Sequence, residues 1–339
     1  MIRIIILVIS SSVISISLLA QEKSHTKPDF YIIGRLDSNV EFSHETSAFE
    51  WGNSGLYTQL SGPIGDHLHY LILNHWVSSG TKELYDNIGR SDSPNFLDFA
   101  FVKYSNHGLS VEFGKDLIPF GTIEQDGDDY SAHPFMSSVF WNTACLYQWG
   151  TQVSYSLPSE KTSFTIGIAA SPFGEHPFKN GMMSYSIQWR GHYDLFASIW
   201  SINLLEMPGK RFLSMLAFGN QLTIGNFSVA VDFVNTAALD VAGFFKQEMT
   251  LVGFLDYQLC DKVELQAKLG RERNNCADSF FLDGLFMAQP YWFWGTAVNY
   301  YPLKENRDFR LHLGVAWKNN LKGMIASLGV LYSMNLSTL

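Results

Sequence analysis

The chain has 339 residues, of which 46% are hydrophobic, 15% are aromatic and only 16% are charged, with a net charge of −9 at pH 7. Soluble domains usually carry about a quarter charged residues, so a soluble protein of this composition would have difficulty covering its surface. The negative balance argues against nucleic acid as a partner, because phosphate backbones bind clustered Lys and Arg.

Residues 1–20 have the pattern of a secretory signal peptide. Arg3 supplies a short positive region, an apolar stretch follows through Leu19, and Ala20 offers a small residue before Gln21. Serines interrupt the apolar stretch, which disfavours the alternative of an N-terminal membrane anchor. No later stretch has about 18 consecutive apolar residues, so the sequence predicts no helical membrane span. We therefore expect an exported chain whose single mature domain spans residues 21–339.

The mature chain carries a period-two hydrophobic pattern through most of its length, which is typical of β-strands between two environments. In residues 30–42, apolar and small residues at even positions alternate with Arg35, Asp37, Asn39 and Glu41. Comparable segments, separated by turn-forming residues, follow at 52–61, 66–77, 96–104, 109–114, 147–155, 164–170, 183–190, 192–201, 210–219, 225–235, 247–257, 263–269, 290–301, 309–318 and 323–336. The sequence thus predicts about 16 strands, within a range of about 14–18.

Two architectures fit this alternation. In a soluble sandwich the apolar face lies in a core, whereas in a transmembrane barrel it meets lipid and the polar face lines a lumen. The low charge and the Trp and Tyr residues near predicted strand ends, such as Trp51, Trp76 and Trp317, favour the barrel. Its edges must close, because unpaired backbone groups in hydrocarbon are too costly. We predict an all-β, transmembrane antiparallel β-barrel in the outer membrane of a Gram-negative bacterium.

Two predicted connections are long, at 79–95 and 116–143, and the second has an unusual composition. After a break at Pro119-Phe120-Gly121 it carries an acidic run and then an apolar, aromatic return. A loop with an apolar portion would sit badly in water, so we expect it to fold inward and narrow the lumen. The alternative is an external loop with solvated carboxylates. The predicted constriction residues are Lys115, Glu124, Asp126, Asp128 and Asp129, and the predicted lumen wall includes Arg35, Asp37, Glu112, Arg190 and Arg310.

The spacing of Gly114 and Pro119-Phe120-Gly121, between an alternating strand and a long loop, resembles the phosphate-selective porin O and P family. The motif covers about thirty residues, and the likeness in architecture covers the whole mature chain. The resemblance implies a sixteen-stranded, typically trimeric outer-membrane barrel whose third loop folds into the pore. The chain departs from the family at Leu117, where Lys is frequent, in its few lumen-facing arginines, and at its C-terminal Leu339, where an aromatic residue is common.

We therefore predict a porin, not an enzyme: a water-filled channel for passive diffusion of small hydrophilic solutes or ions. The acidic loop favours cations or neutral solutes over phosphate, and we expect no cofactor and no metal. The predicted partners are the solutes, outer-membrane lipid and two further copies in a homotrimer. Two alternatives stay open. A lipid hydrolase would use His75 as its general base, although Ser78 falls on the opposite strand face. A secreted carbohydrate-binding protein would stack its exposed aromatic residues on sugars.

Cysteines and histidines give no strong signal of a disulfide framework or a metal site. Three cysteines in an exported chain are too few for a framework, and the one pairing considered joins Cys260 to Cys276. His67 and His69, predicted on one strand face, lack a third ligand. The acidic run at 126–129 lacks the spaced ligands of an EF-hand, although a Ca²⁺ ion there is an open alternative.

Overall fold

The structure is a computed structural model that describes residues 27–42, 47–52, 54–78, 97–127, 131–138, 140–141, 146–174, 181–236, 248–273, 291–303, 307–319 and 323–338. The predicted signal peptide, the whole predicted connection at 79–95, and both Asp128 and Asp129 lie outside the described residues. Among the described residues, no helix is long and apolar enough to cross a membrane.

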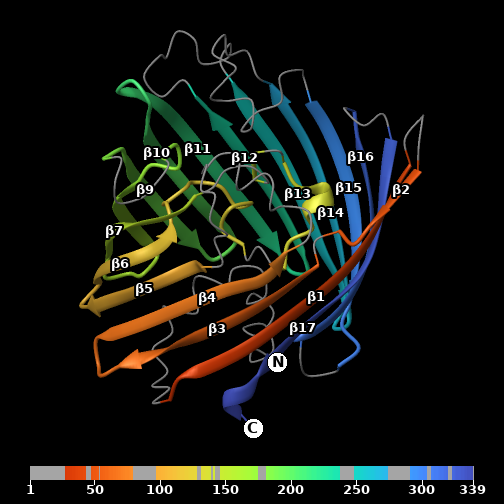
Figure 1. The fold of residues 1–339 in the computed structure, drawn as a ribbon, viewed down its shortest axis with the longest axis horizontal. Coiled ribbons are helices and arrows are strands. Elements are labelled where there is room, and N and C mark those ends of the chain that lie inside the picture. Colours follow the sequence, from red (N-terminus) through yellow and green to blue (C-terminus); the bar gives the residue numbers. More distant parts are fainter. Residues whose placement is uncertain are drawn as a thin grey trace.

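The described strands form one antiparallel sheet that closes on itself (Figure 1). Closure comes from β1, which pairs with β3 on one side and with the last strand, β17, on the other. In the part of the chain that the structure describes, two short 3-10 turns, η2 (Pro134–Met136) and η4 (Leu336–Thr338), accompany the sheet. The strands are β1 (Asp29–Phe42), β2 (Ser47–Glu50), β3 (Gly55–Ile64), β4 (Leu68–Ser78), β5 (Leu97–Asn106), β6 (Leu109–Leu117), β7 (Tyr147–Ser156), β8 (Thr162–Ala170), β9 (Met183–Tyr193), β10 (Phe196–Met207), β11 (Arg211–Ile224), β12 (Phe227–Asn235), β13 (Met249–Cys260), β14 (Val263–Arg273), β15 (Tyr291–Tyr300), β16 (Phe309–Lys318) and β17 (Gly323–Asn335).

The barrel has sixteen strand positions, because β2 and β3 share one of them. Both pair with β1, β2 along residues 39–42 and β3 along residues 29–35. The sixteen strands predicted from the sequence correspond to β1 and β3–β17, so the prediction of an antiparallel barrel of about sixteen strands is confirmed. The four residues of β2 were not predicted, since so short a segment shows no recognisable period.

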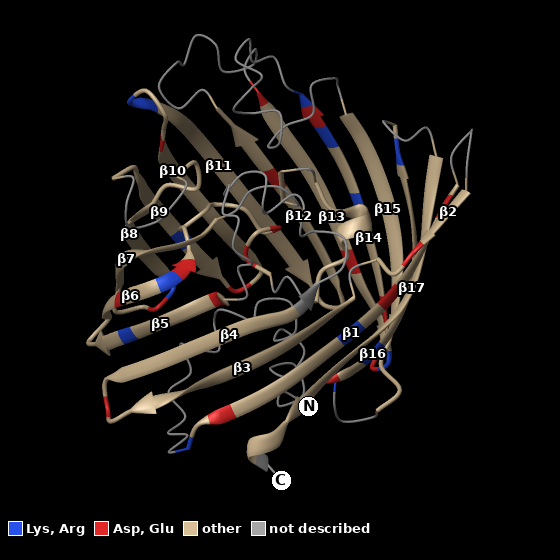
Figure 2. Cartoon of the chain, in the orientation of Figure 1, with Lys and Arg blue, Asp and Glu red and all other residues tan. Residues whose placement is uncertain are grey.

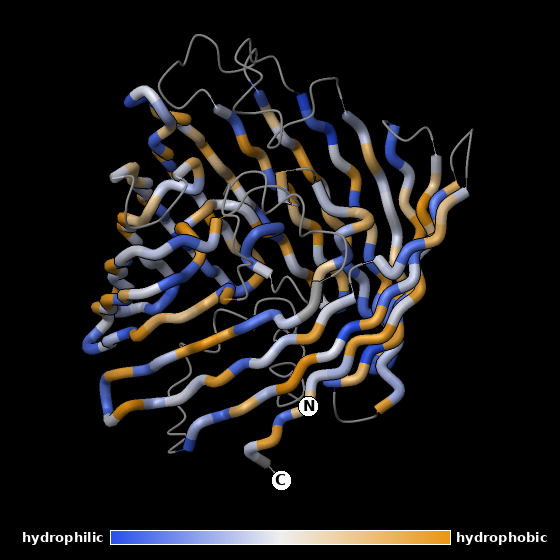
Figure 3. The backbone as a smooth tube through the Cα atoms, viewed as in Figure 1, coloured by the Kyte–Doolittle hydropathy of each residue, from blue (hydrophilic) through white to orange (hydrophobic). Residues whose placement is uncertain are grey.

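The outer face of the barrel is apolar. Leu36 is 52% exposed and Phe113 is 70% exposed, whereas Arg35 and Asp37, at alternate positions of β1, are only 4% and 2% exposed. Figure 3 shows the same alternation of hydrophobic and hydrophilic residues along the strands, and Figure 2 shows that charged residues are sparse on them. A continuous apolar surface of this kind suits lipid rather than water, and the described strands close into a barrel.

The inner face carries small, polar and apolar side chains that contact the connection between β6 and β7. Ile118, Phe120 and Phe140 of this connection form one buried cluster with Leu205, Met215 and Val234 of β10–β12. Phe135 and Met136 form another with Ala297 of β15 and Ala316 of β16. We refer to residues 118–141 as the inner segment.

Candidate functional site

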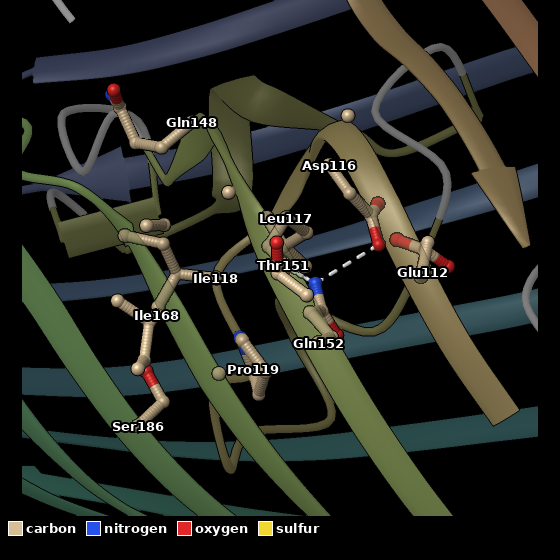
Figure 4. A pocket seen from close by; sticks show the side chains of 14 residues that line it. Glu112, Asp116, Leu117, Ile118, Pro119, Gln148, Thr151, Gln152, Ile168 and Ser186 are labelled. Carbon is tan, nitrogen blue, oxygen red and sulfur yellow. Dashed lines mark hydrogen bonds between the residues drawn. The ribbon is translucent and has the colours of Figure 1, made fainter. Parts of the chain in front are cut away.

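Strand β6, which leads into the inner segment, approaches β5 closely at Gly114. Gly114 has a φ of 145°, and a Cβ atom there would lie 2.1 Å from the carbonyl oxygen of Ala100. Only glycine fits this conformation and this close approach to β5. Glu112 and Asp116, on either side of Gly114 in the chain, point their carboxyl groups toward one another beside a small cavity (Figure 4). Gln152 donates to Asp116 Oδ2 at 3.1 Å.

The predicted lumen-wall residue Glu112 is one of the residues that line this cavity. The volume of the cavity is about 10 Å³, room for one water molecule. The predicted constriction residue Lys115 lies in the same part of β6 and donates to the carbonyl oxygen of Leu97 at the start of β5. Glu112 and Lys115 therefore lie on β6, just before the inner segment and before the run that contains Glu124 and Asp126.

The Pro119-Phe120-Gly121 motif is hydrogen-bonded to β9 and β10. The carbonyl of Pro119 accepts from Asn203 at 2.8 Å, and that of Phe120 accepts from Gln188 at 3.0 Å. The amide of Gly121 donates to Ser201 Oγ at 2.8 Å. Asn203 and Ser201 are fully buried or nearly so, which means that these bonds are made away from solvent and position the chain firmly.

The turn after this motif is capped by the buried carboxylate of Asp232 on β12. Its two oxygens accept the amides of Ile123 at 2.8 Å and Glu124 at 2.7 Å. Gly219 of β11 makes room for the turn, because a Cβ atom there would lie 2.8 Å from the amide nitrogen of Ile123. Sequence reasoning missed Asp232, and its one signal was an acidic residue within the mostly apolar strand Phe227–Asn235.

Both described carboxylates of the acidic run are paired with cations of the wall. Asp126 accepts both guanidinium nitrogens of Arg190 at 2.6 and 2.7 Å. Glu124 accepts hydrogen bonds from Lys268 Nζ at 3.2 Å and from Ser138 Oγ at 2.6 Å. Their fields are therefore largely cancelled where they arise. Lys268 was not predicted, and because Arg190 uses both oxygens of Asp126, that carboxylate is poorly available to Ca²⁺.

The turn at 131–133 is held by two arginines of the wall. Arg35 donates to the carbonyl of Ala132, and Arg310 donates to the carbonyl of Ser131 at 2.8 Å. Arg35 also pairs with Asp37 at 2.7 Å. The structure thus brings Arg35, Asp37 and Arg310 together at one part of the inner segment, and Arg190 at another.

Two glycines of the wall accommodate the apolar turn η2. A Cβ atom on Gly295 would lie 2.4 Å from Met136 Cβ, and one on Gly314 would lie 2.4 Å from Phe135 Cζ. We predict that Gly295→Val weakens the contact of residues 134–138 with the wall by about 1–3 kcal/mol, the usual cost of overpacking. Hydrogen exchange of this peptide in detergent measures the effect. Gly253→Ala is the matched control, because nothing lies nearer than 3.9 Å to a Cβ atom there; equal exchange in both variants would contradict the prediction.

His75, His67 and His69 were the residues considered for a hydrolase or a metal site. His75 Nδ1 lies 2.6 Å from Asp98 Oδ1, so an imidazole–carboxylate pair exists, but the side chain of Ser78 lies outside those described. His67 lies in the turn before β4 rather than on a strand, which corrects the predicted shared face with His69. Within the described ranges no group of three or more His, Cys, Asp or Glu residues could hold a metal ion. Cys260 is free and exposed.

Comparison with known proteins establishes the fold. No protein-family model and no curated protein matches the chain. A variant of Rh. blastica porin superposes with a TM-score of 0.60 over 91% of this chain and 100% of that chain, at 11% identity. OmpT of Vibrio cholerae, folded in vitro and in trimer form, gives a TM-score of 0.55 over 91% and 99% of the two chains, at 13% identity. Outer-membrane expressed OmpT of Vibrio cholerae gives 0.54, with 12% identity and 91% and 97% covered. The chain is therefore similar to porin-type barrels, whereas its resemblance to the phosphate-selective family has no support from sequence comparison.

Proposed function

We propose that the chain is an outer-membrane porin through which small hydrophilic solutes or ions diffuse passively. The observation that carries the proposal is the inner segment, which the wall holds through charged and polar side chains such as Arg190, Lys268 and Asp232. A barrel that served only as an anchor would need no such internal segment, whereas a segment held on the inner wall limits the free cross-section of a channel.

The membrane and the oligomer are part of this proposal. The apolar outer face suits the outer membrane of a Gram-negative bacterium, which is where barrels of this kind occur. A trimer form is recorded for the similar OmpT of Vibrio cholerae, and we propose a homotrimer for this chain. No catalytic role is proposed, because the His75–Asp98 pair has no nucleophile assigned to it.

Charge preference in the proposed channel depends on how far the carboxylates of the acidic run are neutralised. Glu124 and Asp126 are paired with Lys268 and Arg190, so they contribute little net field. We propose that Asp128 and Asp129 supply any preference for cations, and that the preference is weak. A preference for phosphate, as in the O and P family, would be a more specific function. It would depend on Arg35 and Arg310, which donate hydrogen bonds to backbone carbonyls of the inner segment.

The testing experiment is the reversal potential across a planar bilayer under a salt gradient, with purified, folded, full-length protein. We expect a steady conductance with a small cation preference that disappears in the Asp128→Asn, Asp129→Asn double variant. Glu264→Gln is the control, because Tyr301 and Arg307 already engage that carboxylate. A correctly folded, heat-modifiable protein without conductance would overturn the porin proposal. An anion preference would retain the channel and move the selectivity to the arginines.

A further inference from the structure

Two rows of inward-facing residues lie beneath the turn at 131–133, one crossing β1, β17, β16 and β15 and the other crossing β1, β17 and β16. Strand register places Asp37, Gly329, His312 and Asn299 side by side in one row. Register also aligns Arg35 with Leu331 and Leu331 with Arg310 in the second row. The wall therefore presents two cations, two neutral polar groups and one carboxylate to a single turn of the inner segment.

The side chain of His133, in the turn at 131–133, packs against the first row, and the residue is only 2% exposed. Its Nε2 lies 2.9 Å from Asn299 Oδ1, and its ring centroid lies 4.9 Å from that of His312. His312 Nε2 is 3.1 Å from Asp37 Oδ1. This approach requires a glycine at position 329, because a Cβ atom there would lie 2.3 Å from Asp37 Oδ1.

The surroundings of His133 are unsuited to a positive charge. Arg310 and His312 of β16 and Arg35 of β1 face it, and among the described residues the one carboxylate beside them, Asp37, already pairs with Arg35. Farther away, Glu264 and Tyr301 act on Arg310. Burial, followed by the charge of Arg310, holds the pKa of His133 well below its usual range. Among the described residues, His133 Nδ1 has no hydrogen-bond partner, so a proton there would have no acceptor.

We propose that His133 is an acid-sensitive latch, whose protonation releases residues 131–136 from the wall. The released ring takes up a proton from solvent at Nδ1 and regains water as a hydrogen-bond partner. Contact with the wall is then fully favoured above the ordinary histidine pKa of about 6.5 and is progressively lost as the pH falls below it. The consequence for conduction rests on the proposed porin function, because release changes the channel only if the channel conducts.

Hydrogen exchange of the peptide spanning 131–138, in folded full-length protein, tests the latch without requiring conduction. The amides of Met136 and Ser137 donate to the carbonyls of His133 and Pro134, so they report on this turn. After correction for the intrinsic pH dependence, we expect exchange about 30-fold faster at pH 5 than at pH 7.5, as one histidine predicts. His133→Gln, which keeps a partner for Asn299 but cannot be charged, should abolish the difference, and His69→Gln should leave it intact.

A second variant guards against misfolding of the first. Asn299→Asp places a carboxylate beside His133, stabilises the protonated ring on the wall, and should reduce the increase well below 30-fold. Equal exchange at both pH values in the unmodified chain, or an increase that survives in His133→Gln, would overturn the latch. Conductance recorded at the same pH values separates the two proposals. Acid-dependent exchange without any conductance refutes only the porin, whereas conductance with pH-independent exchange refutes only the latch.

Discussion

Replacing Asp232 by Ala is expected to free the turn at 123–126 from the wall. The carboxylate accepts the amides of Ile123 and Glu124 and is 2% exposed, so its removal leaves two amides without their acceptor. Hydrogen bonds to a charged group contribute about 1.5–3 kcal/mol each. The variant also removes the cost of burying a charge. We therefore expect the free energy of contact between the turn and the wall to fall by about 3 kcal/mol, which is roughly a hundredfold in the equilibrium between the bound and the released turn.

Hydrogen exchange of residues 122–127 and single-channel conductance measure this loss together. Exchange should rise about a hundredfold, and the conductance should become larger and noisier as the turn leaves the wall. Asp256→Ala is the control, since Asp256 is an inner-wall aspartate that interacts with Glu264, Gln266 and Lys268 of β14. Asp232→Asn, which retains one acceptor oxygen, should fall between the two. If Asp232→Ala exchanges no faster than Asp256→Ala, the carboxylate does not hold the turn.

The strands of the barrel could be predicted because each strand shows its two environments locally. In β1, Leu36 faces outward and Arg35 and Asp37 face inward, as the alternation indicates. The same reasoning assigned Glu112, Arg190 and Arg310 to inward positions, and all three have little or intermediate exposure. Period two therefore identifies the face of a residue without any knowledge of which strands are neighbours.

The partners of the inner segment could not be predicted, because they are distant in the sequence. Glu124 meets Lys268 across 144 positions, and its amide meets Asp232 across 108. Alternation places Lys268 and Asp232 on the inner face, but it carries no information about which inner residue the segment reaches. The composition of the run suggested free carboxylates for the same reason: the cations that pair with Glu124 and Asp126 belong to other strands.

The pair of Lys268 and Glu124 gives the second large effect. The side chains of Lys268 and Glu124 are 14% and 5% exposed. Among the described residues, the only other hydrogen-bond donor to the Glu124 carboxylate is Ser138, through its amide and its hydroxyl group. Lys268→Met leaves this carboxylate buried without its cation, and removing one partner of a buried pair costs about 3–5 kcal/mol. We expect this loss in the contact between the inner segment and the wall rather than in the strand ladders.

A double-mutant cycle with Glu124→Gln separates the pair from its surroundings. Since the amide side chain of this variant is neutral, Lys268→Met should cost much less in that background, with a coupling free energy of about 2 kcal/mol or more. The exposed pair of Lys161 and Asp194, at 3.1 Å but with side chains 51% and 85% exposed, is the control, and Lys161→Met should change nothing measurable. Hydrogen exchange of residues 122–127 and 131–138 provides the free energies. Additive effects at Lys268 and Glu124 would mean that the wall holds the segment through Asp232 and the apolar clusters alone. The ion pair would then contribute no coupling free energy to the contact.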